Sequence, residues 1–132
     1  MEIFFPYKAT TRGLTVRVAP AFLAEQSDPA RGHWFWGYHV RLENNGADAV
    51  QLISRRWLIT DGRGLEHEVV GDGVVGEQPM IAVGASYDYV SGCPLNTPTG
   101  SMEGSYHMIS ADGSSFEAAI PRFQLIASPV AS

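Results

Sequence analysis

The stretch GDGVVG, from Gly71 to Gly76, has the spacing G-x-G-x-x-G of a dinucleotide-binding loop, in which glycines let the backbone approach a pyrophosphate. Such a site also needs a parallel strand before the loop, a helix that opens on the last glycine and an acidic residue about twenty positions further on. Here EQP follows directly, and MIAVG ends at Gly84 without room for a helix. Asn96, not an acidic residue, stands twenty residues after Gly76. The spacing alone therefore does not predict a dinucleotide site.

The charge around these glycines also argues against a bound phosphate. Lys8 is the only lysine, so neither a kinase-type glycine loop nor a Walker loop has the lysine that pairs with phosphate. No Lys or Arg lies between positions 66 and 77, but four carboxylates do: Glu66, Glu68, Asp72 and Glu77. We interpret the glycines as structural, supplying positive φ or a close crossing at a strand corner. Phosphate or nucleotide binding at the Gly71–Gly76 corner stays an alternative.

The same carboxylates are candidate ligands for a divalent cation. In a strand, Glu66 and Glu68 share one face and His67 points to the other. With Asp72 from the turn, the two glutamates would make a weak oxygen-ligand site for Mg²⁺ or Ca²⁺. An acidic strand edge that blocks pairing with another chain explains the same residues, so both interpretations stay open.

The remaining reactive residues form no catalytic constellation. The four histidines have no ligand spacing between them, and Cys93 precedes Pro94 with no basic neighbour to activate the thiol. No G-x-S-x-G or H-E-x-x-H motif occurs. We therefore expect a protein without catalytic activity and without a cofactor.

Length and composition indicate one acidic domain. The chain has 132 residues and a net charge of −5, which argues against non-specific binding to nucleic acid or to an anionic membrane. The single cysteine fits a reducing compartment, and no apolar run approaches the roughly 18 residues that a spanning helix needs. We expect one domain over 1–132, with its core at about 13–126, in the cytoplasm, with no nucleic-acid partner and no membrane insertion.

Apolar and polar residues alternate along most of the chain, which predicts β-strands. The clearest strand, at 33–43, places five apolar residues on one face: Trp34, Trp36, Tyr38, Val40 and Leu42. The turn signal DGRG at 61–64 predicts a hairpin between strands at 50–60 and 65–70. Shorter strands are expected at 14–18, near 74–81, and at 87–91, 105–110, 116–120 and 123–126. The segments 19–32 and 92–102 lack a strand pattern and are expected to be surface loops.

Many short strands separated by turns predict an antiparallel β-sandwich or a barrel. Tyr106 stands near the start of an expected strand, where immunoglobulin sandwiches often carry a tyrosine at the corner before their penultimate strand. This favours an immunoglobulin/fibronectin type III-like antiparallel β-sandwich over a closed barrel. Arg55 and Arg56 interrupt the apolar strand at 50–60, which indicates a bulge or an ion pair with a carboxylate.

Segments spread along the chain resemble the ApaG domain family. The likeness lies in AEQSDP, VQLISRRWLITDGRG, EVVGDGVVGEQPMIAVG, YVSGCPLNTPTGSMEGSYHM and FEAAIPRFQL. These segments follow one another from about Val16 to Leu125 and so cover nearly the whole chain. The family usually has a proline-glycine turn where this chain has Val83 and Gly84. Of the two arginines, Arg55 matches the family motif better than Arg56.

The resemblance implies a fibronectin- or immunoglobulin-like sandwich with no established catalytic activity. Bacterial members are small stand-alone proteins that genetics links to cobalt resistance and magnesium efflux. Related domains in eukaryotic F-box proteins and in a polymerase-interacting protein look like protein-interaction modules. We therefore expect a non-catalytic binding module with a protein partner of unknown identity, and a free strand edge would also allow a homodimer. The alternatives are a weak divalent-cation-binding regulator, or phosphate or nucleotide binding at the glycine corner.

The expected binding surface combines the corner at 71–78 with the segment at 92–102. Both should lie at the surface, because a buried loop would leave backbone polar groups unpaired. The candidate binding residues are Gly71, Gly73, Gly76, Gln78, Arg55, Thr97 and Gly100.

Overall fold

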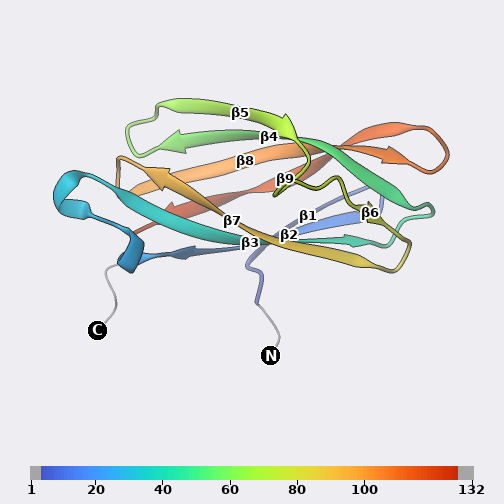
Figure 1. Ribbon diagram of the computed structural model, residues 1–132, viewed down its shortest axis with the longest axis horizontal. Coiled ribbons are helices and arrows are strands. Elements are labelled where there is room, and N and C mark those ends of the chain that lie inside the picture. The colour runs from blue at the N-terminus through green and yellow to red at the C-terminus, as the bar shows by residue number, and fades with distance from the viewer. Residues whose placement is uncertain (1–3, 128–132) are drawn as a thin grey trace.

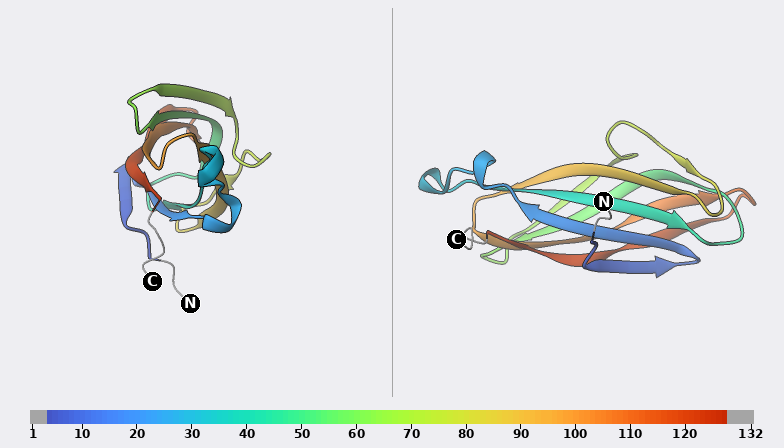
Figure 2. Two further views of the ribbon diagram at one scale, coloured as in Figure 1. Left: turned by 90° about the vertical axis from the view of Figure 1, so that its left-hand side faces the viewer. Right: turned by 90° about the horizontal axis from the view of Figure 1, so that it is seen from below.

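A computed structural model of the chain describes residues 4–127 as an elongated two-layer β-sandwich (Figure 1, Figure 2). Its strands are β1 (Tyr7–Thr11), β2 (Leu14–Phe22), β3 (Trp34–Asn44), β4 (Val50–Asp61), β5 (Glu66–Asp72), β6 (Met80–Ile81), β7 (Ser86–Leu95), β8 (Thr99–Ser110) and β9 (Ser115–Ile126). Two short 3-10 helices, η1 (Ala24–Gln26) and η2 (Pro29–Arg31), connect β2 to β3. Across residues 4–127, no helix is long and apolar enough to cross a membrane. The expected immunoglobulin/fibronectin type III-like antiparallel sandwich is confirmed.

The two sheets meet along one side of the sandwich and stay apart along the other. One sheet has the order β1-β2-β3-β7, and the other has the order β5-β4-β8-β9 with β6 also paired to β4. On one side β9 contacts β1 and β2, and the backbone N–H of Ala119 donates to Thr11 Oγ1 at 3.1 Å. On the opposite side the edge strands β5 and β7 are not paired to each other. We call this second side the open side.

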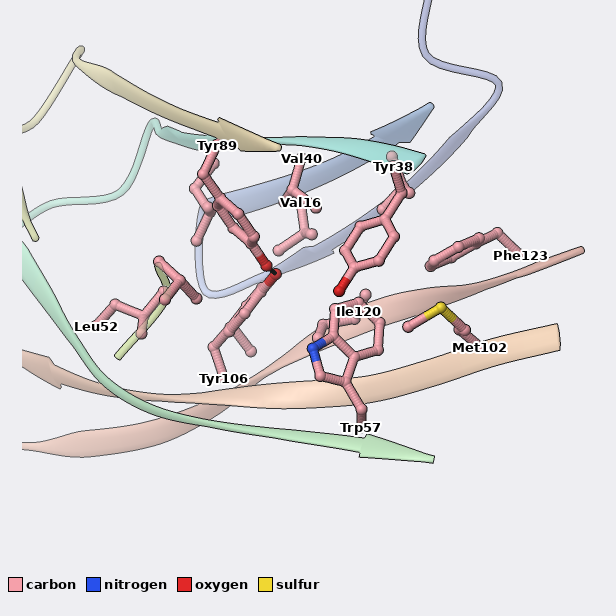
Figure 3. Packing of buried hydrophobic residues seen from close by; sticks show 14 of the residues in the cluster. Val16, Tyr38, Val40, Leu52, Trp57, Tyr89, Met102, Tyr106, Ile120 and Phe123 are labelled. Carbon is pink, nitrogen blue, oxygen red and sulfur yellow. Dashed lines mark hydrogen bonds between the residues drawn. The ribbon is translucent and has the colours of Figure 1, made fainter. Parts of the chain in front are cut away.

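Aromatic side chains from both sheets fill the core (Figure 3). Tyr38 of β3 packs against Trp57 and Phe123 of the other sheet, with ring centroids 5.4 and 5.8 Å apart. The hydroxyls of Tyr89 and Tyr106 hydrogen-bond to each other across the core. Such aromatic pairs contribute about 0.5–1.5 kcal/mol each beyond the burial of their surface. They therefore fix the sheets relative to each other as well as exclude water.

Tyr106 is not the corner tyrosine that its position suggested. β8 begins at Thr99, so Tyr106 lies well inside the strand, where it is fully buried. Its hydroxyl has Tyr89 as its partner instead of the upstream backbone. The fold prediction is confirmed, but this argument for it is wrong, because the glycines at 100 and 104 hide the first half of β8 from the alternation pattern.

Both segments expected to be loops contain strand. β2 continues to Phe22, which reduces the loop at 19–32 to the segment with the two 3-10 helices. β7 continues to Leu95 and β8 begins at Thr99, so only residues 96–98 connect them. Pro94 masks this strand in the sequence, but a proline is tolerated at the edge of a sheet because no neighbouring strand needs its N–H. The expected loop at 92–102 is therefore a tight strand connection.

Three further strand predictions need correction. Only Met80–Ile81 is strand in the segment 74–81, because the residues before it form a tight turn. The strands expected at 116–120 and 123–126 are one strand, β9, with an irregular register between Ile120 and Phe123 that leaves both side chains buried. Finally, β1 has no counterpart among the expected strands.

The turn that precedes β7 suits a proline. The N–H of Ala85 donates to the carbonyl of Ala82 at 3.0 Å, and Gly84 has a φ of 83°, as in a type II turn with Val83 at the first central position. Proline pre-sets the φ of that position, and Val83 is exposed. We expect Val83→Pro to raise the free energy of unfolding by about 0.4–1 kcal/mol, because it restricts the unfolded chain.

Urea denaturation followed by tryptophan fluorescence measures this change. Val75→Pro is the matched control, because Val75 is also an exposed turn valine but has a φ of 44°, which proline cannot adopt. We expect this control to be destabilised. A loss of stability in Val83→Pro would contradict the turn type.

Candidate functional site

The open side of the sandwich contains a groove made of two adjoining hollows. One hollow, of about 270 Å³, lies beside the glycine corner, and the other, of about 380 Å³, runs along β7. Four residues line both: Tyr38, Arg55, Trp57 and Ser91. We call this continuous depression the open-side groove. Tyr89 and residues 91–95 of β7 form one wall, and alternate residues of β4 and β5 form the other. Asp72 and residues 74–76 close one end.

The alternation of β4 and β5 decides which side chains enter the groove. Trp57 and Val69 are paired in register, and both line the groove together with His67. Because successive side chains of a strand point to opposite faces, Glu66 and Glu68 lie on the outer face. The prediction that His67 and the two glutamates occupy opposite faces is confirmed.

Arg55 connects the groove to the glycine corner. Its Nη1 donates to the carbonyl oxygens of Asp72 and Gly73 at 3.0 and 2.7 Å. Gly71 leaves room for the guanidinium, since a Cβ at that position would lie 2.9 Å from Nη2 of Arg55. The arginine thus binds backbone carbonyls instead of a carboxylate. The ion pair predicted for this part of the strand belongs to Arg56.

The two glycines at the tip of the corner serve the backbone. Val74 and Glu77 exchange backbone hydrogen bonds, so Val75 and Gly76 form a two-residue turn with φ values of 44° and 81°, as in type I′. Gly73 has a φ of 62°, and a Cβ there would lie 2.1 Å from the carbonyl oxygen of Glu77. Positive φ and close approach are the structural roles that the sequence indicated.

The backbone donors of the corner are largely engaged. The N–H of Gly73 donates to the carbonyl of Ile53, and the N–H groups of Val74 and Glu77 bond within the turn. A phosphate site at a glycine-rich loop depends on such N–H groups pointing at the anion. The geometry therefore does not favour phosphate or nucleotide binding at the Gly71–Gly76 corner.

The candidate residues divide between the two ends of the groove. Arg55 and Gly76 line the end at the corner, where Gly71 accommodates the arginine. Gln78 lies beside this end, where its Nε2 donates to the carbonyl of Ile53 at 2.8 Å and anchors the corner to β4. The structure thus brings these predicted residues together.

Thr97 lies in the connection between β7 and β8, and Gly100 lies near the start of β8, both beyond the other end of the groove. Thr97 is buried, and its Oγ1 accepts from the N–H of Gly62 and donates to the carbonyl of Thr99, both at 2.8 Å. A Cβ at Gly100 would lie 2.5 Å from Cδ1 of Leu95. Thr97 therefore joins the β4–β5 turn to the connection between β7 and β8, and Gly100 leaves room for the side chain of Leu95.

The three candidate metal ligands do not form one site. Glu68 pairs with the guanidinium of Arg56 on the outer face, whereas Asp72 lines the end of the groove. In the described part of the chain, residues 4–127, no three His, Cys, Asp or Glu side chains group as ligands. The structure therefore does not bring Glu66, Glu68 and Asp72 together.

Burial raises the pKa of one thiol and two tyrosine hydroxyls along the groove. It raises the pKa of the Cys93 thiol to about 11. It also raises the pKa of Tyr38, an effect that hydrogen bonding with Ser91 and the positive charge of Arg55 partly offset. The pKa of Tyr89 rises for the same reason. The groove thus contains neutral hydroxyl and thiol groups beside the Arg55 cation.

The sequence missed most of this groove. Tyr38 belongs to the apolar face expected for the strand at 33–43. It packs in the core with Trp57, but both residues also form the floor of the groove. Ser91 is the residue whose place in the sequence could have indicated the groove. It occupies an inward position of β7 between Tyr89 and Cys93, and a polar residue at such a position indicates an opening in the core.

The two antiparallel sheets, their aromatic core and the open-side groove place the chain in the class of immunoglobulin/fibronectin type III-like sandwiches. Residues 24–110 match the family model of the ApaG domain. The chain therefore belongs to the ApaG domain family.

Related proteins and solved structures are similar over most of the chain. Protein ApaG of Methylobacterium sp. strain 4-46 is 57% identical over 119 residues, covering 90% of this chain and 92% of the relative. Protein ApaG of Bradyrhizobium sp. strain ORS 278 is 53% identical with the same coverage. A crystal structure from Bordetella pertussis, solved as an ApaA protein, is 48% identical with a TM-score of 0.84, covering 86% of this chain and 92% of that one. A second X-ray structure, at 38% identity, has a TM-score of 0.82 and covers 91% of this chain and 90% of that chain.

The close approach at Gly73 predicts that this glycine tolerates no side chain. We expect Gly73→Ala to lower the free energy of unfolding by about 2–3 kcal/mol, because positive φ strain adds to the collision with the Glu77 carbonyl. Gly76→Ala is the matched control, since Gly76 also has positive φ, but a Cβ there would meet nothing within 4 Å. It should lose only about 1 kcal/mol. Urea denaturation of both variants tests this, and equal losses would contradict the role of the close approach.

The buried hydroxyl and thiol groups predict a loss of stability in alkali. Burial raises the pKa values of Tyr38, Tyr89, Tyr106 and Cys93 in the folded state, whereas in the unfolded chain cysteine ionises near about 8.5 and tyrosine near about 10. Above about pH 9 the unfolded chain therefore binds fewer protons than the folded one, so stability falls as pH rises. Each group that is ionised only in the unfolded state contributes a slope of about 1.4 kcal/mol per pH unit.

Urea denaturation at pH 8, 9 and 10 checks this slope, and absorbance at 295 nm reports ionised tyrosine. Below about pH 8 these groups are protonated in both states and contribute no pH dependence. A constant free energy of unfolding from pH 8 to pH 10 would contradict this prediction, because it would mean that these groups ionise as readily in the folded protein as in the unfolded chain.

Proposed function

We propose that this ApaG-domain chain is a non-catalytic module that binds a partner protein through the open-side groove. The main support for this proposal is that the groove has exposed apolar side chains along its rim and polar and aromatic side chains on its floor. Val69 and Val75 are 41% and 57% exposed at the rim. Apolar side chains that stay exposed beside a concave surface are typical of interaction sites.

The floor of the groove has the residue types that dominate binding energy at protein interfaces. Arginine, tyrosine and tryptophan are enriched among such residues, and Arg55, Tyr38 and Trp57 line the groove. Nη1 of Arg55 is engaged with backbone carbonyls, whereas its Nε and Nη2 have no acceptor within residues 4–127. These donors suit a carbonyl or carboxylate of a partner.

The groups in the groove support a binding role more than a catalytic one. The thiol of Cys93 is buried, and its raised pKa of about 11 keeps it protonated at neutral pH. A reactive cysteine needs the thiolate and a neighbouring base or cation. This thiol donates a hydrogen bond to the carbonyl of Pro94 at 3.8 Å.

The family resemblance links such proteins to cobalt resistance and magnesium efflux, and we propose an indirect role there. The separated carboxylates of β5 favour action through a partner over direct binding of the cation. The single buried cysteine and the net charge of −5 agree with a cytoplasmic protein that does not bind nucleic acid.

Affinity capture with a pair of matched variants tests the groove. Val69→Arg places a charge in the groove, whereas Ile109→Arg places the same charge on β8, outside the groove. Both residues are exposed β-branched residues, at 41% and 38%. We expect the wild-type chain and Ile109→Arg to capture the same partner, and Val69→Arg to retain at least tenfold less of it.

Two results would contradict the proposal. Equal retention or equal loss of the partner in both variants would contradict binding through the groove, provided that near-UV circular dichroism shows both variants folded. In NMR titrations, saturable shifts at Glu66–Asp72 with Mg²⁺ or Co²⁺, or at Gly71–Gly76 with nucleotide, would favour the alternative functions.

A further inference from the structure

The free edge of β5 borders the open-side groove. β5 pairs with β4 along one edge, and among the strands of residues 4–127 it has no neighbour along the other (Figure 1). Six of its seven residues are exposed. Unpaired N–H and C=O groups along such an edge form a template for another extended chain.

Two backbone hydrogen bonds establish which residues present those groups. The N–H of Asp61 donates to the carbonyl of Leu65 at 2.9 Å, and the N–H of Gly73 donates to that of Ile53 at 2.8 Å. Hydrogen-bonded and non-hydrogen-bonded pairs alternate along an antiparallel ladder, so the odd-numbered residues of β5 bond to β4. The even-numbered residues direct their backbone groups to the free edge; they include Glu66, Glu68 and Val70.

The two faces of β5 require different side chains from an added strand. On the groove side, Val69 lies opposite Trp57, so apolar side chains would be buried there. On the outer side, Glu66 and Glu68 carry negative charge. Arg56 already pairs with Glu68, whereas Glu66 has no ionic partner among the described residues. Opposite charges on neighbouring strands stabilise a sheet, so basic side chains would be favoured on this side.

The neighbouring edge and a second copy of the chain fit less well. The free edge of β7 includes Pro94, which has no N–H to donate, and prolines of this kind protect sheet edges. Two copies paired through β5 would bring Glu66 and Glu68 of one copy into the same short ladder as those of the other. Like charges at such positions are destabilising.

We propose that an extended segment of a partner protein, with alternating apolar and basic residues, adds to the free edge of β5 and covers the open-side groove. Its basic side chains lie beside Glu66 and Glu68, and its apolar side chains lie over Val69 and Trp57. This inference rests on the proposed function and names the chemistry of the ligand. The added strand pairs with β5 and becomes the new edge of the sheet β5-β4-β8-β9.

A synthetic peptide provides the probe. We expect a fluorescein-labelled nine-residue peptide of alternating valine and arginine to bind the wild-type chain saturably, as measured by fluorescence anisotropy. A matched peptide with glutamate in place of arginine should bind at least tenfold more weakly. Glu66→Lys should reduce this preference at least threefold, because it reverses the charge beside the added strand.

Two proline variants locate the binding edge. Val70→Pro removes an N–H from the free edge of β5 without removing a bond to β4, and should weaken binding of the arginine peptide at least tenfold. Val90→Pro is the matched control, because Val90 is similarly exposed, at 62% against 67%, and by the same alternation directs its N–H to the free edge of β7. It should bind as wild type does. Near-UV circular dichroism verifies the fold of each variant.

Hydrogen exchange gives a readout that groove binding without strand addition would not produce. On peptide binding, the amides of Glu66, Glu68 and Val70 should gain protection, whereas odd-numbered amides of β5 are already protected by β4. If the protection of β5 amides rises uniformly or does not change on peptide binding, strand addition is wrong. Equal affinity for the two peptides, equal loss in both proline variants, or self-association of the wild-type chain that Val70→Pro abolishes would also overturn strand addition.

The two proposals can fail separately. If the arginine peptide does not bind at millimolar concentration, this inference is wrong, and the capture experiment with Val69→Arg still decides whether the groove binds a partner. The opposite result is also possible, in which Val69→Arg retains its partner but the arginine peptide protects the alternating amides of β5. The groove proposal then fails. Of the edge proposal, the backbone pairing with β5 is then supported, but the cover over the groove is not.

Discussion

Contacts between aromatic side chains of the two sheets determine the shape of the molecule. Tyr38 packs against Trp57 and Phe123, and the hydroxyls of Tyr89 and Tyr106 are hydrogen-bonded to each other (Figure 3). These contacts hold the layers together in the middle, while the edge strands β5 and β7 remain unpaired with each other. The floor of the open-side groove is the exposed margin of this core. The same residues therefore stabilise the fold and shape the surface that we propose binds a partner.

Arg55 extends this rigid framework to the glycine corner. Its bonds to the carbonyls of Asp72 and Gly73 hold the end of β5 against β4, and Gly71 is small enough to admit the guanidinium. A site of this kind is built mainly on strands, so its groups are already placed before a ligand arrives. Pre-placed groups reduce the entropy lost on binding. The exposed edge of β5 adds a second feature beside the groove. Its backbone is ordered by pairing with β4 on one side and has no paired strand on the other.

The glycine motif shows that a match in sequence spacing does not by itself identify a nucleotide site. In GDGVVG the spacing of a nucleotide loop occurs at a hairpin-like corner, where Gly73 allows the close approach of Glu77 and Gly76 completes a two-residue turn. The sequence anticipated this structural role, because both the missing helix and the surrounding carboxylates are local features. It did not anticipate the partners of Arg55. Those partners are distant in the chain and become neighbours only through the pairing of β4 with β5.

Alternation by itself determined β3, because its inward and outward positions follow from a period of two. In β4 the inward positions change from even to odd numbers at the irregularity between Leu52 and Ser54. The DGRG turn likewise determined the β4–β5 hairpin, since it needs only neighbouring residues. Composition misled where proline and glycine interrupt the pattern, as at Pro94 in β7. Tertiary structure alone decided which edges remain open and that Ser91, Trp57 and Val69 line one groove. Strand order depends on contacts between residues far apart in the sequence, and no local pattern contains that information.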